Sequence, residues 1–191
     1  MARPKSFDRG AVVASAMQVF WREGYQGASL SSLGPAMGLQ PGSIYATFGS
    51  KEALFREALS AYSALVREGV DGDHGPRAIL ERWFARLIDA ALDVPDGELG
   101  RGCLLLASAV ETPRLDPESA AQVRRELDAL EAFLRRCVAA ERRRSPRPDA
   151  PGPAATARLL VASLAGISAL SRAGAPRRTL EDVANAALAL V

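Results

Sequence analysis

GYQGASLSSLGPAMGLQPGSIYATFGSKEALF, residues 24–55, is the stretch that decides the fold of this chain. Ser29 is suited to cap the start of a helix, and Gly38 is suited to end one. Pro41 stands where proline fits the first turn of the next helix. The pattern predicts a short helix over residues 29–38 and another over residues 41–47, joined by a tight turn.

The second of these helices has the form that DNA recognition requires, because it is short and its first residues are free to enter the major groove. Ile44 and Phe48 are four residues apart and are expected to face the core. Gly42 would let the backbone come close to DNA. Tyr45 can offer its hydroxyl to a phosphate and its ring to base methyl groups. The side chains expected to face outward are those of Gln40, Ser43, Ala46 and Thr47.

Basic residues on either side of this segment extend the predicted DNA surface. Lys51 and the free amides at the start of its own helix are expected to bind a phosphate. Arg3 and Lys5 could reach the DNA backbone or the minor groove as an N-terminal arm. A plain surface turn between core helices would show the same periodicity, so the pattern alone leaves that alternative open.

Helical periodicity dominates the rest of the chain, and no convincing alternating strand appears. The sequence predicts a helix-turn-helix domain over residues 1–50, a linking helix over residues 51–70, and a larger helical domain over residues 71–191. Polar, glycine-rich and proline-rich loops are expected at residues 69–77 and 144–153. Further helices are predicted at residues 8–23, 51–68, 79–92, 102–111, 117–143, 154–173 and 180–191.

Composition limits the classes of protein to consider. The net charge is +2, from 24 basic and 22 acidic side chains, so DNA affinity must come from a local surface. The N-terminus lacks an apolar stretch, and the longest uncharged stretch in the C-terminal half, between Arg158 and Arg172, is shorter than the ~20 residues of a membrane span. We expect a protein without a membrane segment, located in the cytoplasm, with reduced thiols.

The motif at residues 41–55 closely resembles the recognition helix and the following helix of the tetracycline-repressor (TetR) family, and residues 24–40 match the same motif in register. The resemblance is strong over about residues 8–60. It implies an all-α fold of about nine helices, with an N-terminal three-helix helix-turn-helix domain and a C-terminal helical ligand-binding and dimerisation domain. It also implies a homodimer, usually a repressor, that binds a palindromic double-stranded DNA operator. Ligand binding would release the DNA. The DNA contacts that it implies are Ser29, Gln40, Gly42, Ser43, Tyr45, Thr47 and Lys51.

Two prolines depart from the family pattern. Pro41 occupies a position that is often basic in the family, which removes one phosphate contact. Pro35 lies inside the first helix of the motif, where proline costs about 3 kcal/mol, so that helix is expected to begin later or to kink. Ser29 could be a helix cap, a phosphate ligand, or both.

The C-terminal domain is expected to hold an unidentified small-molecule effector in an apolar cavity. The alternative is that the apolar side chains concerned form an ordinary core. The helix over residues 51–68, with Tyr62 and Leu65 near its inner end, is the expected mechanical link to the DNA-binding half. The proposed cavity residues are Trp83, Phe84, Leu87, Cys103, Leu106, Val110 and Phe133.

The last two helices are predicted to form the dimer interface, because two such hairpins would make a four-helix bundle across a two-fold axis. One apolar stripe comprises Leu160, Leu164 and Ile167. The other comprises Leu180, Ala184, Ala187, Leu188 and Val191.

GRGCLLLASAVE, residues 100–111, is similar to a Gly-Cys-Leu segment of electrophile-sensing TetR-family members, in which the cysteine is the reactive centre. That chemistry needs an exposed thiol with a lowered pKa. Arg101, or the positive end of the helix dipole if Cys103 lies in the first turn of a helix, could lower the pKa of the Cys103 thiol. The alternative is a buried cysteine that packs as a hydrophobic side chain.

Nothing in the sequence indicates an enzyme, a cofactor or a metal site. The single histidine, His74, lies in a Gly/Asp loop, and neither zinc-ligand spacing nor a phosphate-binding glycine loop is present. Three classes remain: a ligand-controlled DNA-binding regulator, a constitutive DNA-binding dimer, and a helical small-molecule-binding protein or enzyme that keeps the helix-turn-helix as a relic.

Overall fold

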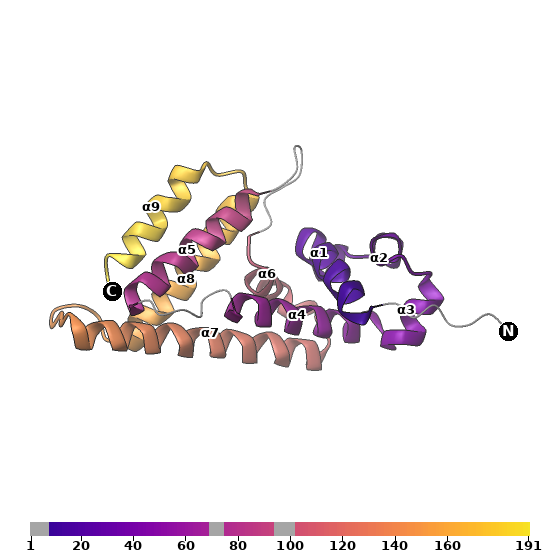
Figure 1. The fold of residues 1–191 in the computed structure, drawn as a ribbon, viewed down its shortest axis with the longest axis horizontal. Helices are drawn as coiled ribbons and strands as arrows, with labels where there is room; N and C mark the ends of the chain where they lie inside the picture. Colours follow the sequence, from indigo (N-terminus) through magenta and orange to yellow (C-terminus); the bar gives the residue numbers. More distant parts are fainter. Residues whose placement is uncertain (1–7, 69–74, 94–101) are drawn as a thin grey trace.

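A computed structural model of the chain describes residues 8–68, 75–93 and 102–191. Within those ranges the regular structure consists of nine α-helices and one 3-10 turn, without strands, which confirms the all-α prediction (Figure 1). The helices are α1 (Arg9–Gly27), α2 (Leu30–Met37), α3 (Pro41–Phe48), α4 (Lys51–Glu68), α5 (Pro76–Leu92), α6 (Leu104–Glu111), α7 (Pro117–Arg144), α8 (Pro153–Arg172) and α9 (Arg177–Leu188), with the 3-10 turn at Thr112–Arg114.

Helices α1 to α3, which include the predicted helix-turn-helix, form a head at one end of an elongated molecule (Figure 1). Asp8 caps α1 by accepting the N–H groups of Gly10 and Ala11 at 2.9 and 3.3 Å. Regular helix ends at Gly24, whose φ of +73° is accessible to glycine at little cost. The head packs on α4 through Phe20, whose ring meets that of Phe55 edge-on at 5.3 Å.

Helix α2 begins where the sequence predicted, but its expected weakness is absent. Ser29 caps it by accepting the N–H of Ser32 at 3.1 Å. The helix then runs through Pro35 to Met37, so the prediction of a later start is wrong. Proline leaves only the carbonyl of Ser31 without its usual donor, and Ser31 is exposed, so water can supply one.

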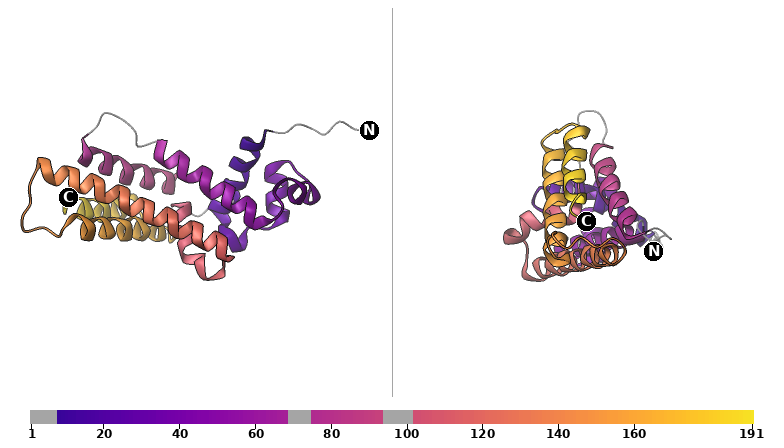
Figure 2. Two further views of the ribbon diagram at one scale, coloured as in Figure 1. Left: turned by 90° about the horizontal axis from the view of Figure 1, so that it is seen from below. Right: turned by 90° about the vertical axis from the view of Figure 1, so that its left-hand side faces the viewer.

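Helices α5 to α9 form the body, and α4 connects it to the head (Figure 2). Helix α7 runs along most of the length of the body and packs on α5, α6 and α8. Helices α5 and α9 begin about three residues earlier than predicted. Pro76 is the first residue of α5, and Pro176 directly precedes α9.

The residues predicted for the dimer interface lie inside a single protomer, so the choice of these residues is wrong, whereas the use of the last two helices for pairing stays a prediction. Leu160, Leu164 and Ile167 of α8 are buried against the rest of the body, and so are the α9 residues Leu180, Ala184, Ala187 and Leu188, together with Val191. The opposite side of α8 is a separate apolar surface, which we call the outer face. It comprises Leu159, Ala162, Gly166 and Ala169, spaced three or four residues apart, together with Leu170. Leu159 and Leu170 are exposed, and nothing lies within 4 Å of a Cβ built on Gly166.

Apolar residues on both sides explain the hydropathy of α8. Among the described helices it is the only one with the length and composition of a membrane span. Its buried side packs on α5, α7 and α9 in the way that a core helix does. The same composition therefore follows from one face in the core and a second apolar face at the surface.

Candidate functional site

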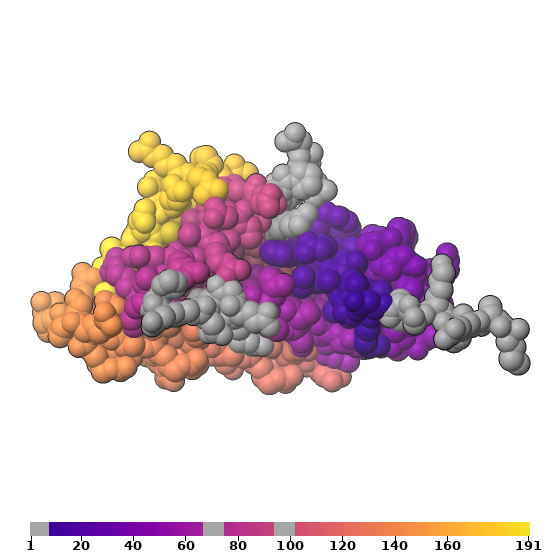
Figure 3. Space-filling model, viewed as in Figure 1, coloured from indigo at the N-terminus to yellow at the C-terminus, as the bar shows by residue number. Residues whose placement is uncertain are grey.

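Helix α3 presents a polar face at the end of the molecule. Ile44 and Phe48 are buried in the head, as predicted. Gln40, Ser43 and Tyr45 are exposed, and the Tyr45 ring keeps half of its surface open. Ala46 is exposed as well, whereas Thr47 is only half-exposed. Figure 3 shows the head, in indigo and purple, at one end of the elongated molecule.

Gly42 gives this face room for a close approach. It is exposed in the first turn of α3, and a Cβ built there meets no atom within 4 Å. A flat backbone surface of this kind is what a helix needs to come near the DNA backbone.

Arg9 holds α3 in place on the head, a role that the sequence analysis missed. Its guanidinium forms an ion pair with Glu57 of α4 and lies 4.5 Å from the centre of the Phe48 ring. It also donates to the carbonyl oxygen of Thr47 at 3.4 Å. One side chain of α1 therefore ties the end of α3 to α4.

Ser29 and Lys51 begin the helices on either side of α3, because Ser29 directly precedes α2 and Lys51 is the first residue of α4. The Ser29 hydroxyl caps α2, which establishes the first of its two predicted roles. The Lys51 ammonium lies 4.5 Å from the centre of the Tyr25 ring, and burial there lowers its pKa. Tyr25 in turn donates to Glu52 at 2.8 Å. Arg3 and Lys5 lie outside the described residues.

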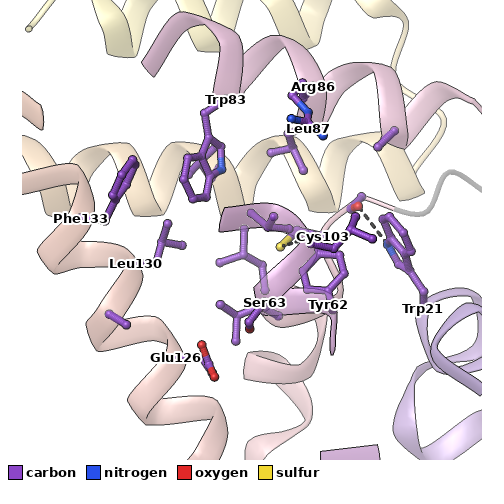
Figure 4. A pocket seen from close by; sticks show the side chains of 18 of the residues that line it. Trp21, Tyr62, Ser63, Trp83, Arg86, Leu87, Cys103, Glu126, Leu130 and Phe133 are labelled. Atoms are coloured by element: carbon purple, nitrogen blue, oxygen red, sulfur yellow. Dashed lines mark hydrogen bonds between the residues drawn. The ribbon is translucent and has the colours of Figure 1, made fainter. Parts of the chain in front are cut away.

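A cavity of about 260 Å³ lies in the body between α4, α5, α6 and α7 (Figure 4). Trp83 and Phe133 stand at one end of it, and Tyr62 and Trp21 at the other. The sequence predicted five of its wall residues: Trp83, Leu87, Cys103, Leu106 and Phe133.

Two predicted cavity residues lie elsewhere. Trp83, Leu87 and Ala90 line the cavity at helical spacing, which turns Phe84 to another side of α5, where it is buried in the core. Val110 is 83% exposed on the outside of α6. Apolar character marked both residues as buried or ligand-binding, but it could not indicate which side of each helix faces the cavity.

Trp21 joins the cavity to the DNA-binding head. It belongs to α1 and lines the cavity. Its indole N–H donates to the carbonyl oxygen of Gly102 at 2.9 Å, and its own carbonyl accepts from Arg172 of α8 at 2.7 Å. Its ring meets that of Tyr62 edge-on at 5.1 Å. Trp21 thus connects α1 to the residues just before α6, to α4 and to α8.

Glu111 makes a second link between body and head at the other end of α6. Its carboxylate accepts the backbone N–H groups of Tyr25 and Gln26 at 2.8 and 3.1 Å. These two amides follow Gly24, where regular helix ends. Helix α6 is therefore attached to α1 at both of its ends, near the cavity through Gly102 and away from it through Glu111.

Comparison with known proteins identifies the family. A sequence pattern described as bacterial regulatory proteins of the tetR family matches residues 12–58. The TetR family transcriptional regulator CifR, solved as a cysteine mutant in complex with 26-bp double-strand operator DNA, is 31% identical, with 98% of each chain covered and a TM-score of 0.79. This chain belongs to the TetR family.

Two curated relatives agree with that assignment. The uncharacterized HTH-type transcriptional regulator YezE of Bacillus subtilis is 28% identical across the full length of both chains. The HTH-type transcriptional repressor ComR of Escherichia coli is 47% identical over 60 residues, which are 31% of this chain and 29% of that protein. The TetR family consists of DNA-binding transcription regulators, and this chain has the helix-turn-helix head that defines them.

Cys103 does not have the environment predicted for a reactive TetR-family thiol. It directly precedes α6, and its sulfur accepts from the Tyr62 hydroxyl at 3.2 Å. Burial raises the pKa of the Cys103 thiol and outweighs the opposing effect of the Tyr62 hydroxyl and of the amides of Leu105 and Leu106 at the start of α6. This environment agrees with the alternative of a cysteine that packs as a hydrophobic side chain, and Arg101 lies outside the described residues.

Gly102 explains why Cys103 is held there. Its φ is +60°, and a Cβ built on it would lie 2.3 Å from the Ser168 hydroxyl oxygen, so only glycine fits. The next amide, that of Cys103, donates to the same Ser168 oxygen at 3.0 Å. The Gly-Cys pair thus fastens the start of α6 to α8.

Alkylation of Cys103 by iodoacetamide is expected to be slow at pH 7. It should accelerate as the pH rises above the pKa range of ordinary thiols. The thiolate is the reactive form, and a raised pKa reduces its fraction at any pH below that pKa. Peptide mass spectrometry, which separates Cys103 from the buried Cys137, measures the rate. The same protein in urea is the control. Equal rates in the folded and unfolded chains at pH 7 would contradict this prediction.

Proposed function

We propose that this TetR-family protein is a cytoplasmic repressor that binds a palindromic operator as a homodimer and leaves it when a small, largely apolar effector fills the cavity. The observation that carries the proposal is the position of Trp21, which lies in the cavity wall and in the DNA-binding head at once. An effector in the cavity therefore touches the head without an intermediate element.

The proposed DNA surface is the polar face of α3. Gln40, Ser43 and Tyr45 are exposed there, and Gly42 leaves room for the DNA backbone. Direct contacts to base edges provide specificity, and contacts to phosphates fix the register. That CifR was solved with operator DNA supports this assignment. The full proposed set is Ser29, Gln40, Gly42, Ser43, Tyr45, Thr47 and Lys51.

The proposed dimer interface is the outer face of α8 and the exposed side of α9 beside it. Small residues such as Ala162, Gly166 and Ala169 let two helices approach closely. Leu159 and Leu170 would lose their exposed apolar surface on pairing. A two-fold axis at this face would give the four-helix bundle predicted from the sequence, with different residues at its centre.

The proposed switch is a shift between two arrangements of the head on the body. Filling the cavity moves Tyr62 of α4 and the start of α6, and Trp21 transmits the movement to α1. The two recognition helices then leave the spacing of about 34–36 Å that successive major grooves require. Crystal structures with DNA and with effector that had the same recognition-helix separation would overturn this mechanism.

Selection from random duplex DNA tests the function. The protein is expected to enrich an inverted repeat whose half-sites lie one or two helical turns apart, with affinity that falls steeply as salt rises. An effector found by thermal-shift screening is then expected to release the selected duplex. Failure to enrich any sequence would favour a small-molecule-binding protein or enzyme that keeps the helix-turn-helix without using it to bind DNA. Enrichment without release by any cavity-binding compound would favour the constitutive dimer.

A cysteine-based electrophile sensor is the second candidate, because Cys103 lines the cavity. In that version a reactive effector would alkylate the thiol after binding beside it. The raised pKa of Cys103 argues against rapid reaction at neutral pH. The alkylation experiment above separates the two candidates.

A further inference from the structure

Ser63 has a buried hydroxyl group that lacks a hydrogen-bond partner among the described residues. It belongs to α4 and lines the cavity, with only 7% of its surface exposed. Serines within helices usually donate to a carbonyl of the preceding turn. Ser15, Ser108 and Ser163 do so here, at 3.1, 2.8 and 2.9 Å. The Ser63 oxygen makes no such bond to any residue in the described part of the chain, although an unpaired buried polar group is destabilising.

The other polar groups of the cavity are already engaged. The Tyr62 hydroxyl donates to Cys103, and the Cys103 amide donates to Ser168. Glu126 and Arg86 at the cavity border have interactions of their own. Ser63 is therefore the polar group in the described cavity wall that is buried, lines the cavity and is left for a ligand.

The remaining walls favour a flat, neutral molecule. Trp83 and Phe133 lie with ring centres 5.0 Å apart at one end, and Leu87, Leu106 and Leu130 line the space beside them (Figure 4). The lining arginines, Arg86 and Arg136, are exposed, and the half-buried Glu126 already has an interaction of its own, so none of the three is a fully buried, free countercharge for an ionised ligand. A cavity of about 150 Å³ accepts benzene, so about 260 Å³ suits two fused rings.

We infer that the cavity binds a neutral, two-ring aromatic molecule that carries one hydrogen-bonding group, and that Ser63 selects for that group. The inference rests on the proposed effector function of the cavity and specifies the chemistry of the effector. Ser63 acts as a specificity-determining residue, because its hydroxyl is satisfied only when such a ligand is bound. An apolar ligand of the same shape would leave the hydroxyl unpaired.

Two probes of equal shape test the inference on the full-length protein. 2-Naphthol carries a hydroxyl group where 2-methylnaphthalene carries a methyl group. Calorimetry is expected to give an affinity for 2-naphthol about tenfold higher, the effect of one hydrogen bond to a buried group. Ser63→Ala should reduce that ratio to near one. The matched control is Ser108→Ala, which removes a buried helical hydroxyl outside the cavity and should preserve the ratio.

A second measurement separates selection from a purely structural role. Removing an unpaired buried hydroxyl should raise the melting temperature of the ligand-free protein by about 2–4 °C in Ser63→Ala. A lower melting temperature together with an unchanged probe ratio would overturn the inference, and so would the absence of binding by either probe. Binding of 2-naphthol at the expected ratio without release of DNA would leave the inference intact and contradict the proposed effector function.

Discussion

Gly166→Arg is expected to convert the protein from a dimer into a monomer and to lower its affinity for the selected inverted repeat by at least about 100-fold. The arginine would stand at the centre of the outer face of α8, where a two-fold-related helix must come close. In the isolated protomer a Cβ at this position meets nothing within 4 Å, so the fold should persist. The loss of affinity follows because the second half-site is no longer engaged through a linked partner.

Light scattering after size exclusion measures the oligomeric state of this variant, and fluorescence anisotropy measures its DNA binding. The control is Ala85→Arg, which adds the same charge at an exposed position of α5, away from the outer face. Ile167→Arg is a second comparison and should unfold the protein, because Ile167 is fully buried. A dimeric Gly166→Arg protein with undiminished DNA affinity would show that the interface lies elsewhere.

The error over the dimer residues shows what helical periodicity can and cannot predict. The pattern correctly identified Leu160, Leu164 and Ile167 as one apolar stripe. It could not determine whether that stripe packs within the protomer or against a partner, because burying apolar surface lowers the free energy in both cases. Helix α8 has two apolar sides, and the stripe with the larger residues is in the core. The smaller residues of the outer face remained as the surface available to another chain.

The head was predictable because its signals are local. Ser29, Pro41 and Gly24 determine where helices begin and end, and the four-residue spacing of Ile44 and Phe48 determines which side of α3 is buried. Each of these effects acts within one or two helical turns. The predicted exposure of Gln40 and Ser43 followed directly from them.

The junction between head and body was not predictable, because its contacts are distant in sequence. Trp21 pairs with Gly102, 81 residues away, and with Arg172, 151 residues away. Glu111 caps amides that lie 86 and 85 residues before it. Periodicity marks Trp21 only as an amphipathic residue at the end of α1. Its place in the cavity wall depends on how α6 and α8 pack, which a single sequence does not specify.

Gly42→Val is expected to abolish specific DNA binding while the protein remains folded. The added isopropyl group would project from the exposed first turn of α3, where no atom of the protein lies within 4 Å of a Cβ. Valine is a better helix former than glycine, so the free energy of unfolding should be unchanged or rise by a few tenths of a kcal/mol, roughly. On DNA the same group would keep α3 away from the groove in both protomers. Because each base-specific contact contributes about 1–3 kcal/mol, losing contacts in two half-sites reduces affinity by more than about 100-fold.

Anisotropy with the selected duplex measures that loss, and thermal unfolding checks the fold. Gly152→Val is the matched control, since a Cβ there also meets nothing within 4 Å and the residue lies at the start of α8, away from the head. Size exclusion should find Gly42→Val as dimeric as the unmodified chain, because the outer face of α8 is untouched. The two variants therefore separate the requirements for DNA binding: Gly166→Arg removes the pairing of intact recognition helices, and Gly42→Val removes groove contact from intact dimers. A Gly42→Val protein that still bound the duplex tightly would mean that α3 does not approach DNA through its first turn. That result would also contradict the proposed DNA contacts of Gln40 and Ser43.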